Sequence, residues 1–176
     1  MYFSARKISY IALLSAVSVV LNVLTWTMPG SGFAISFTYI PTFFAGFYFG
    51  PGAGFLVGLI GDLLGCVISP KGAWIPLITL ASALMGVIPG LVRYIPLHEK
   101  ILLVISFLLT YFICSAGVNT FALWFTFART KKTFLVYLLA RLPLQITNMT
   151  LNMILTFVLM PLMKKIIVPR LEKAVR

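Results

Sequence analysis

Long apolar runs recur throughout this chain of 176 residues, and they constrain its fold more than any other feature. Hydrophobic residues make up 61% of the sequence, whereas charged residues make up only 10%. A water-soluble domain of this size does not carry so much apolar surface, because water would have to wet it. A helix of about 20 apolar residues crosses a bilayer. The sequence therefore predicts an all-α integral membrane protein, multi-pass in the cell membrane.

Six apolar segments are expected to form a bundle of six transmembrane helices and a single domain over residues 1–176. Their approximate positions, with uncertain ends, are 8–26, 36–50, 52–69, 75–95, 101–126 and 134–163. The second and third segments are short for a full span, and a re-entrant hairpin is the alternative for them. The first segment is too long for a signal peptide and lacks a small-residue cleavage site, which indicates a retained helix.

Basic residues predict the orientation of the bundle. The chain has 14 Lys and Arg against 3 Asp and Glu, a net charge of +11. Six helices place both termini on one side, which then carries Arg6, Lys7, Arg93, Lys100, Lys164, Lys165, Arg170, Lys173 and Arg176. By the positive-inside rule this side is cytoplasmic, and such charge suits anionic lipid rather than nucleic acid. The rule leaves the outer cations unexplained, namely Lys71, Arg129, Lys131 and Lys132.

A polar stripe opens the last apolar segment. Arg141, Gln145, Asn148 and Asn152 are spaced so that a helix places them on one face. Polar groups facing lipid are costly, so this face is expected to line the bundle interior or a wet cavity. One alternative is that these side chains only hydrogen-bond neighbouring helices; we favour a ligand site.

Asp62 is the only carboxylate inside a predicted helix. One interpretation is a structural salt bridge, for example with Arg141. A second is recognition of a ligand, because a carboxylate accepts two parallel hydrogen bonds from an amidine-like edge. A third is proton coupling, as in a pump.

Aromatic residues gather at the expected outer edge. The three tryptophans, Trp26, Trp74 and Trp124, all map there, and this matches either an interfacial belt or a stacking pocket for a flat ring. Phe37, Tyr39 and the buried-amide candidate Asn119 complete the set. Cations, aromatics and amides together describe a pocket for a small anionic heterocycle, open to the outside. We see no nucleophile–base pair, Cys/His cluster or Walker motif, so we expect no enzyme activity, metal or other cofactor.

Small residues predict close helix contacts. Gly50, Gly54 and Gly58 are four residues apart, and so are Gly86 and Gly90, a pattern typical of packing inside the bundle. Ala12 and Ala16 form a similar pair near the cytoplasmic end of the first segment, which is a candidate docking face for a separate subunit.

The run "SFTYIPTFFAGFYFGPGAGFLVGLIGDLLG", followed by "SPKGAWIPLITLASALMGVIPG", resembles the substrate-binding S components of energy-coupling-factor (ECF) vitamin transporters, and with "GVNTFALWF" it is most similar to their folate branch. The resemblance covers nearly the whole chain. It implies binding of a vitamin from the outside of a bacterial cell, in a pocket formed by the helices expected at 75–95, 101–126 and 134–163. It also implies partnership with a transmembrane T subunit, docked at Ala12 and Ala16, and with two ATPases that drive toppling and inward release. The pterin edge of folate suits Asp62, and its glutamate carboxylates suit the outer cations.

Three alternatives stay open. The first is an S component for another ring compound, such as a queuosine precursor or another vitamin. A small proton-coupled transporter using Asp62 is the second, and a purely structural membrane subunit is the third.

Overall fold

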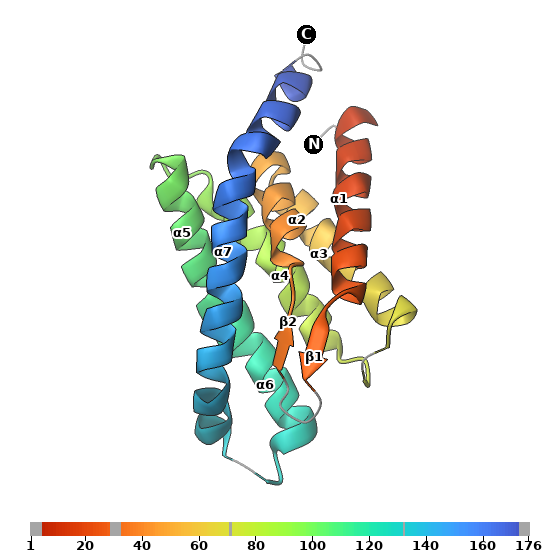
Figure 1. The fold of residues 1–176 in the computed structure, drawn as a ribbon, viewed down its shortest axis with the longest axis vertical. Helices are drawn as coiled ribbons and strands as arrows, with labels where there is room; N and C mark the ends of the chain where they lie inside the picture. The colour runs from red at the N-terminus through yellow and green to blue at the C-terminus, as the bar shows by residue number, and fades with distance from the viewer. Residues whose placement is uncertain (1–4, 29–32, 71, 132, 173–176) are drawn as a thin grey trace.

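The computed structural model describes residues 5–28, 33–70, 72–131 and 133–172. Six helical segments form an elongated bundle (Figure 1). They are α1 (Ala5–Val23); α2 (Tyr39–Phe44) with η1 (Ala45–Phe49); α3 (Pro51–Ile68); α4 (Pro76–Val92); α5 (Glu99–Thr110) with η2 (Tyr111–Asn119), α6 (Thr120–Leu123) and η3 (Trp124–Ala128); and α7 (Phe134–Glu172). Each coincides with one predicted segment, so the six-helix prediction is confirmed.

Three of these segments are long and apolar enough to cross a membrane: Pro51–Ile68, Glu99–Ala128 and Phe134–Lys165. Lys7–Val23 and Pro76–Val92 are shorter apolar helices. The segment Tyr39–Phe49 consists of α2, with 6 residues, and η1, with 5, so it is 11 residues long. At about 1.5 Å per residue it is too short to cross alone, as its sequence predicted. Gly50 then reverses the chain with a φ of 102°, which favours glycine, and Pro51 begins α3.

The start of α1 and the end of α7 lie at the same end of the bundle, together with the α4–α5 connection (Figure 1). At this end Lys164 Nζ pairs with Glu99 Oε2 at 2.7 Å. The opposite end carries the α3–α4 and η3–α7 connections. The grouping of basic residues at one end is therefore present in the fold.

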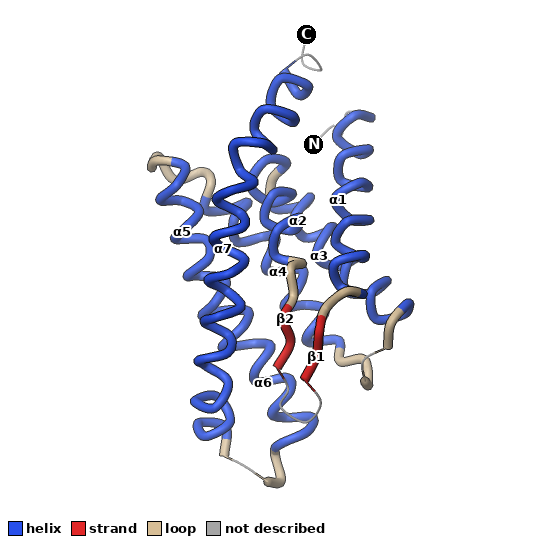
Figure 2. Tube along the Cα trace, in the orientation of Figure 1, coloured by secondary structure: helices blue, strands red, loops and turns tan. Residues whose placement is uncertain are grey.

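A short β-hairpin follows α1 and was not predicted. β1 (Trp26–Met28) pairs antiparallel with β2 (Phe33–Ile35), with Trp26 opposite Ile35 (Figure 2). The first helix consequently ends at Val23 rather than at Trp26. This corrects the predicted boundary and gives Trp26 a place in a strand.

Most of the predicted packing glycines have the expected structural role, whereas a Cβ on Gly50 would meet nothing within 4 Å. α3 and α4 approach so closely that a Cβ on Gly54 would overlap the carbonyl oxygen of Gly86, and the reverse is also true. Gly58 lies in the same way against the carbonyl of Ser82. Helices in lipid lack a hydrophobic drive to associate, so this close contact, rather than large apolar side chains, holds α3 against α4.

Aromatic rings fill the centre of the bundle. The rings of Phe43 and Phe107 are fully buried and stack with centroids 4.1 Å apart. Tyr39 joins this cluster, and its hydroxyl lies 2.6 Å from Ser115 Oγ. Tyr39 is thus part of the core cluster, and its role in ligand stacking stays a prediction.

Candidate functional site

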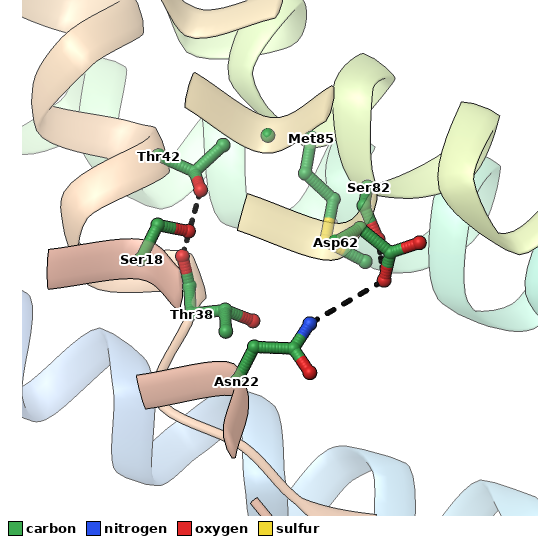
Figure 3. Close-up of a pocket in the computed structure, with 8 residues that line it drawn as sticks. Ser18, Asn22, Thr38, Thr42, Asp62, Ser82 and Met85 are labelled. Atoms are coloured by element: carbon green, nitrogen blue, oxygen red, sulfur yellow. Dashed lines mark hydrogen bonds between the residues drawn. The ribbon is translucent and has the colours of Figure 1, made fainter. Parts of the chain in front are cut away.

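A small polar cavity lies between α1, α2, α3, α4 and the residue that precedes α2 (Figure 3). Its walls carry mostly hydroxyl, amide and carboxylate groups, from Ser18, Asn22, Thr38, Thr42, Gly58, Asp62, Ser82 and Met85. Its free space holds about one water molecule or ion, so the walls must move apart before a ring can enter.

Asp62 supplies the only charge in this cavity and is 8% exposed. Its Oδ2 accepts a short hydrogen bond from Thr79 Oγ1 (2.6 Å). Its Oδ1 accepts only two long ones, from Ser82 Oγ (3.4 Å) and Asn22 Nδ2 (3.5 Å). Among the described residues its hydrogen-bond partners are all neutral, so the predicted salt bridge with Arg141 is absent there.

Two side chains of α1 form the wall opposite Asp62. Ser18 lies directly against Gly61 of α3, and Asn22 lies one turn further against Gly65. A Cβ on either glycine would overlap these side chains, so the glycines allow α1 to bring its polar groups to the carboxylate. Sequence reasoning missed Ser18 and Asn22; their four-residue spacing, matched by the two glycines, was the available signal.

The predicted polar stripe of α7 does face the bundle interior. Arg141 and Asn148 are each 9% exposed, Asn152 is fully buried and Gln145 is half-buried. The guanidinium of Arg141 lies over the ring of Tyr137, 5.6 Å from its centroid. The inward orientation is confirmed, and the role of the stripe in binding stays a prediction.

The amide side chains of α7 hydrogen-bond to the segment before α2 and to the η2–α6 region. Asn152 Nδ2 donates to the carbonyl of Ser36 (2.7 Å), and Asn148 Oδ1 accepts from the Ser36 amide (3.2 Å). Gln145 Nε2 donates to Thr120 Oγ1 (3.0 Å) and to the carbonyl of Ser115 (3.3 Å). Part of the stripe thus serves as interhelical hydrogen bonding. Gln145 Oε1 and Asn152 Oδ1 are buried acceptors with no hydrogen-bond partner among the described residues.

Residues 36–38 connect the stripe to the cavity. Ser36 bonds to α7 through its backbone, while its Oγ lies 2.9 Å from Thr38 Oγ1 and accepts a hydrogen bond from Thr25 Oγ1 (3.2 Å). Thr38 lines the cavity. This short segment therefore bonds to the α7 amides and, through Thr38, lines the cavity that contains Asp62.

The predicted aromatic residues do not converge on the cavity. Trp26 and Trp74 are each 56% exposed, and Trp74 Nε1 donates to Thr79 Oγ1 (2.9 Å). Trp124 is half-buried against the ring of Phe134, with centroids 5.6 Å apart. The three tryptophans lie in β1, in the connection before α4 and in η3, and none of them lines the cavity, so their joint role in stacking a ligand stays a prediction. Phe37 and Asn119 are half-buried and outside the cavity wall.

The two outer cations that the structure describes do not line the cavity. Arg129 and Lys131 are exposed in the connection before α7, and the Arg129 guanidinium lies 5.0 Å from the centroid of the Phe125 ring. Lys71 and Lys132 fall outside the described residues. Water screens exposed charges such as these, which suits capture of an anion better than its final binding.

The candidate docking face of α1 points outward. Ala12 and Ala16 are exposed, and neighbouring Leu13 is 60% exposed, whereas Ile11 and Leu14 are buried on the opposite face. One face of α1 thus packs on α3, while the face with the alanine pair is open.

The arrangement can bind by hydrogen bonding and charge. The described residues contain no group of three His, Cys, Asp or Glu side chains that could hold a metal ion. Of the three helices from which the resemblance implied a pocket, only α4 lines the Asp62 cavity, with α1, α2 and α3 supplying the other helical walls.

Similar proteins share the fold. The chain is 42% identical over 60 residues to the folate transporter FolT of Clostridium novyi (strain NT), a match that spans 34% of this chain and 35%, about a third, of that relative. A crystal structure of FolT bound with folic acid superposes with a TM-score of 0.75 and 23% identity, covering 89% of this chain and 93% of that one. The S component of a bacterial ECF transporter superposes with a TM-score of 0.68 and 22% identity, covering 91% and 96%.

The family match is longer than the match to the relative. The ECF-type riboflavin transporter S component family matches residues 2–165. This match, together with the three membrane-length helices, makes the chain a multi-pass protein of the cell membrane. The chain belongs to the ECF-type riboflavin transporter S component family.

Proposed function

We propose that this chain is the folate-binding S subunit of an ECF-type vitamin transporter. The family supports the transporter role, and the similarity to FolT supports folate as the vitamin. The observation that carries the choice of ligand is Asp62, a buried carboxylate whose Oδ1 faces a cavity with only long hydrogen bonds. The amidine-like edge of a pterin offers two parallel donors, which a carboxylate can accept together.

We place the glutamate tail of folate at the end of the bundle that carries the η3–α7 connection. Arg129 and Lys131 are exposed there and provide positive charge for its carboxylates. The cavity holds only about one water molecule, so its walls must move apart for the pterin edge to reach Asp62, while the tail extends toward the connection before α7. Arg141, Gln145 and Asn148, with Trp26, Phe37, Trp74, Asn119 and Trp124, remain candidate contacts along this path.

Riboflavin is the second candidate, because the matched family is described by that vitamin. It also has a flat ring with hydrogen-bonding groups, but it lacks carboxylates for the outer cations. Calorimetric titration of the purified chain in detergent with folate and with riboflavin separates the two. Heat with folate alone supports the proposal, and heat with riboflavin alone overturns it.

The transporter works with partners and performs no chemistry on its ligand. A transmembrane T subunit docks on the open face of α1 at Ala12 and Ala16, where small side chains let a second helix approach. Two ATPases supply the energy for inward release. The chain acts as one domain. Mass spectrometry should recover the bound vitamin chemically unchanged.

The end of the bundle that carries both termini faces the cytoplasm. Lys100 and Lys164 lie on elements at this end, and positive charge is retained on the cytoplasmic side. A single cysteine introduced at Lys131, in a background without Cys66 and Cys114, should react with an impermeant thiol reagent added to intact cells. Labelling only after the cells are broken would reverse the orientation.

A further inference from the structure

The two oxygens of Asp62 differ in how well they are satisfied. Oδ2 has a short hydrogen bond from Thr79 at 2.6 Å, whereas Oδ1 has contacts of 3.4 and 3.5 Å, at the long limit of hydrogen bonding. Figure 3 shows this carboxylate and Asn22 turned toward one another across the cavity. A buried carboxylate needs a compensating positive charge or strong donors, and Oδ1 lacks both among the described residues.

The groups around Oδ1 are hard oxygen donors. Ser18, Asn22, Thr38 and Ser82 supply hydroxyl and amide oxygens from two helices and the segment before α2. Oxygen ligands of this kind suit alkali and alkaline-earth cations rather than zinc or copper. The charge of the site distinguishes alkali from alkaline-earth cations. One carboxylate balances one positive charge, and the described residues offer no second acidic group for a divalent ion.

We propose that the Asp62 cavity binds a monovalent alkali cation, with Na⁺ as the probe, when no vitamin is present. Asp62 Oδ1 provides the charged ligand and Ser82 Oγ a neutral one. Asn22, whose Nδ2 donates to Oδ1 without the ion, turns its amide oxygen toward the ion, and the hydroxyls of Ser18 and Thr38 complete the shell. The cation draws these groups together and shortens the distances between them, which stabilises the packing of α1 against α3 and α4. The site requires no assumption about which vitamin the protein carries. If a pterin edge uses the same carboxylate, cation and vitamin exclude one another.

The test is thermal unfolding of the vitamin-free full chain in detergent. NaCl replaces choline chloride stepwise at constant total salt, so that general screening stays fixed. Binding to the folded state alone raises Tm with saturation, by about 3–6 °C at a Na⁺ concentration tenfold above Kd. The same Tm in both salts at every step would overturn the proposal.

Three variants locate the effect. Asp62→Asn should abolish the Na⁺-dependent rise in Tm, and Ser82→Ala should retain it but shift its midpoint to higher Na⁺. Glu99→Gln removes an exposed carboxylate that pairs with Lys164, and it should respond as the native chain does. A rise that survives in Asp62→Asn places the ion elsewhere and refutes the site. If Asp62→Asn does not fold, broadening of the ²³Na resonance by the native chain, and its reduction in Ser82→Ala, decide the question. No vitamin enters these assays, so failure of the folate proposal does not alter their outcome.

Discussion

Replacing Asn152 by leucine tests whether α7 holds the segment that borders the cavity. Asn152 is fully buried, and its Nδ2 donates to the Ser36 carbonyl at 2.7 Å and to the Asn148 side chain at 3.3 Å. Leucine has the same branching and the same number of side-chain heavy atoms but no donor, so Asn152→Leu removes these bonds without leaving a hole. The helix itself is expected to persist, because leucine is a strong helix former.

The magnitude follows from the bonds that are lost. A hydrogen bond between membrane helices contributes about 0.6 kcal/mol on average. A buried carbonyl left without a partner costs about 1–3 kcal/mol. Loss of the Ser36 contact therefore destabilises the ordered form of residues 36–38 by about 2 kcal/mol. If folate binds only when this segment is ordered, that free energy raises Kd by roughly 30-fold.

Two measurements on the same sample check this reasoning. Calorimetry should report the weaker binding of folate, and hydrogen exchange should report faster exchange of the backbone amides of residues 36–38. Thr150→Ala is the matched control, because Thr150 is exposed on the same helix and bonds only within it, to the Ile146 carbonyl at 2.8 Å. A folded Asn152→Leu protein with native affinity and native exchange at 36–38 would show that the α7 amides do not support the site.

Three further outcomes are expected. Ala16→Leu should abolish ATP-driven folate uptake by the assembled transporter while calorimetric binding by the isolated chain persists, because the residue faces outward; loss of binding instead would mean that this face packs internally. Asp62→Asn should weaken the binding of folate and of a pterin without the glutamate tail by similar factors. Arg129→Ala should weaken the binding of folate only, by about fivefold, because an exposed charge contributes about 1 kcal/mol. If both variants weaken both ligands equally, Asp62 and Arg129 do not bind different parts of folate. Gly86→Leu should lower Tm markedly in a thermal melt, because its side chain would overlap the backbone of Gly54, and an unchanged Tm would contradict the packing of α3 on α4.

The helices were predictable because lipid imposes a strong and simple requirement. Apolar runs marked each segment, and Pro51 and Pro76 stand at the first positions of α3 and α4, where a missing amide hydrogen costs nothing. The β-hairpin was missed although "WTMPGSGFAI" carries a turn signal between two apolar triplets. The apolar run before it continued to Trp26, and hydropathy does not distinguish a last helical turn from a short strand.

The tryptophans show a second limit of the sequence. Their positions near segment ends predict a shared level in the membrane. Their positions around the bundle depend on helix packing, which the spacing of single residues does not encode. Trp74 consequently bonds to Thr79, Trp124 packs on Phe134, and Trp26 lies in the hairpin.

The surroundings of Asp62 depend on the register between two helices. Ser18 and Asn22 are four residues apart on α1, and Gly61 and Gly65 are four apart on α3, so each polar side chain fits beside one glycine. The sequence contains both spacings, but many pairings of them are possible. A slip of one helical turn, about 5.4 Å, would move Asn22 away from the carboxylate and place a bulkier residue against α3. The polar cavity therefore exists only in the register that the glycines allow, and any force that slides α1 along α3 acts directly on the hydrogen bond between Asn22 and Asp62.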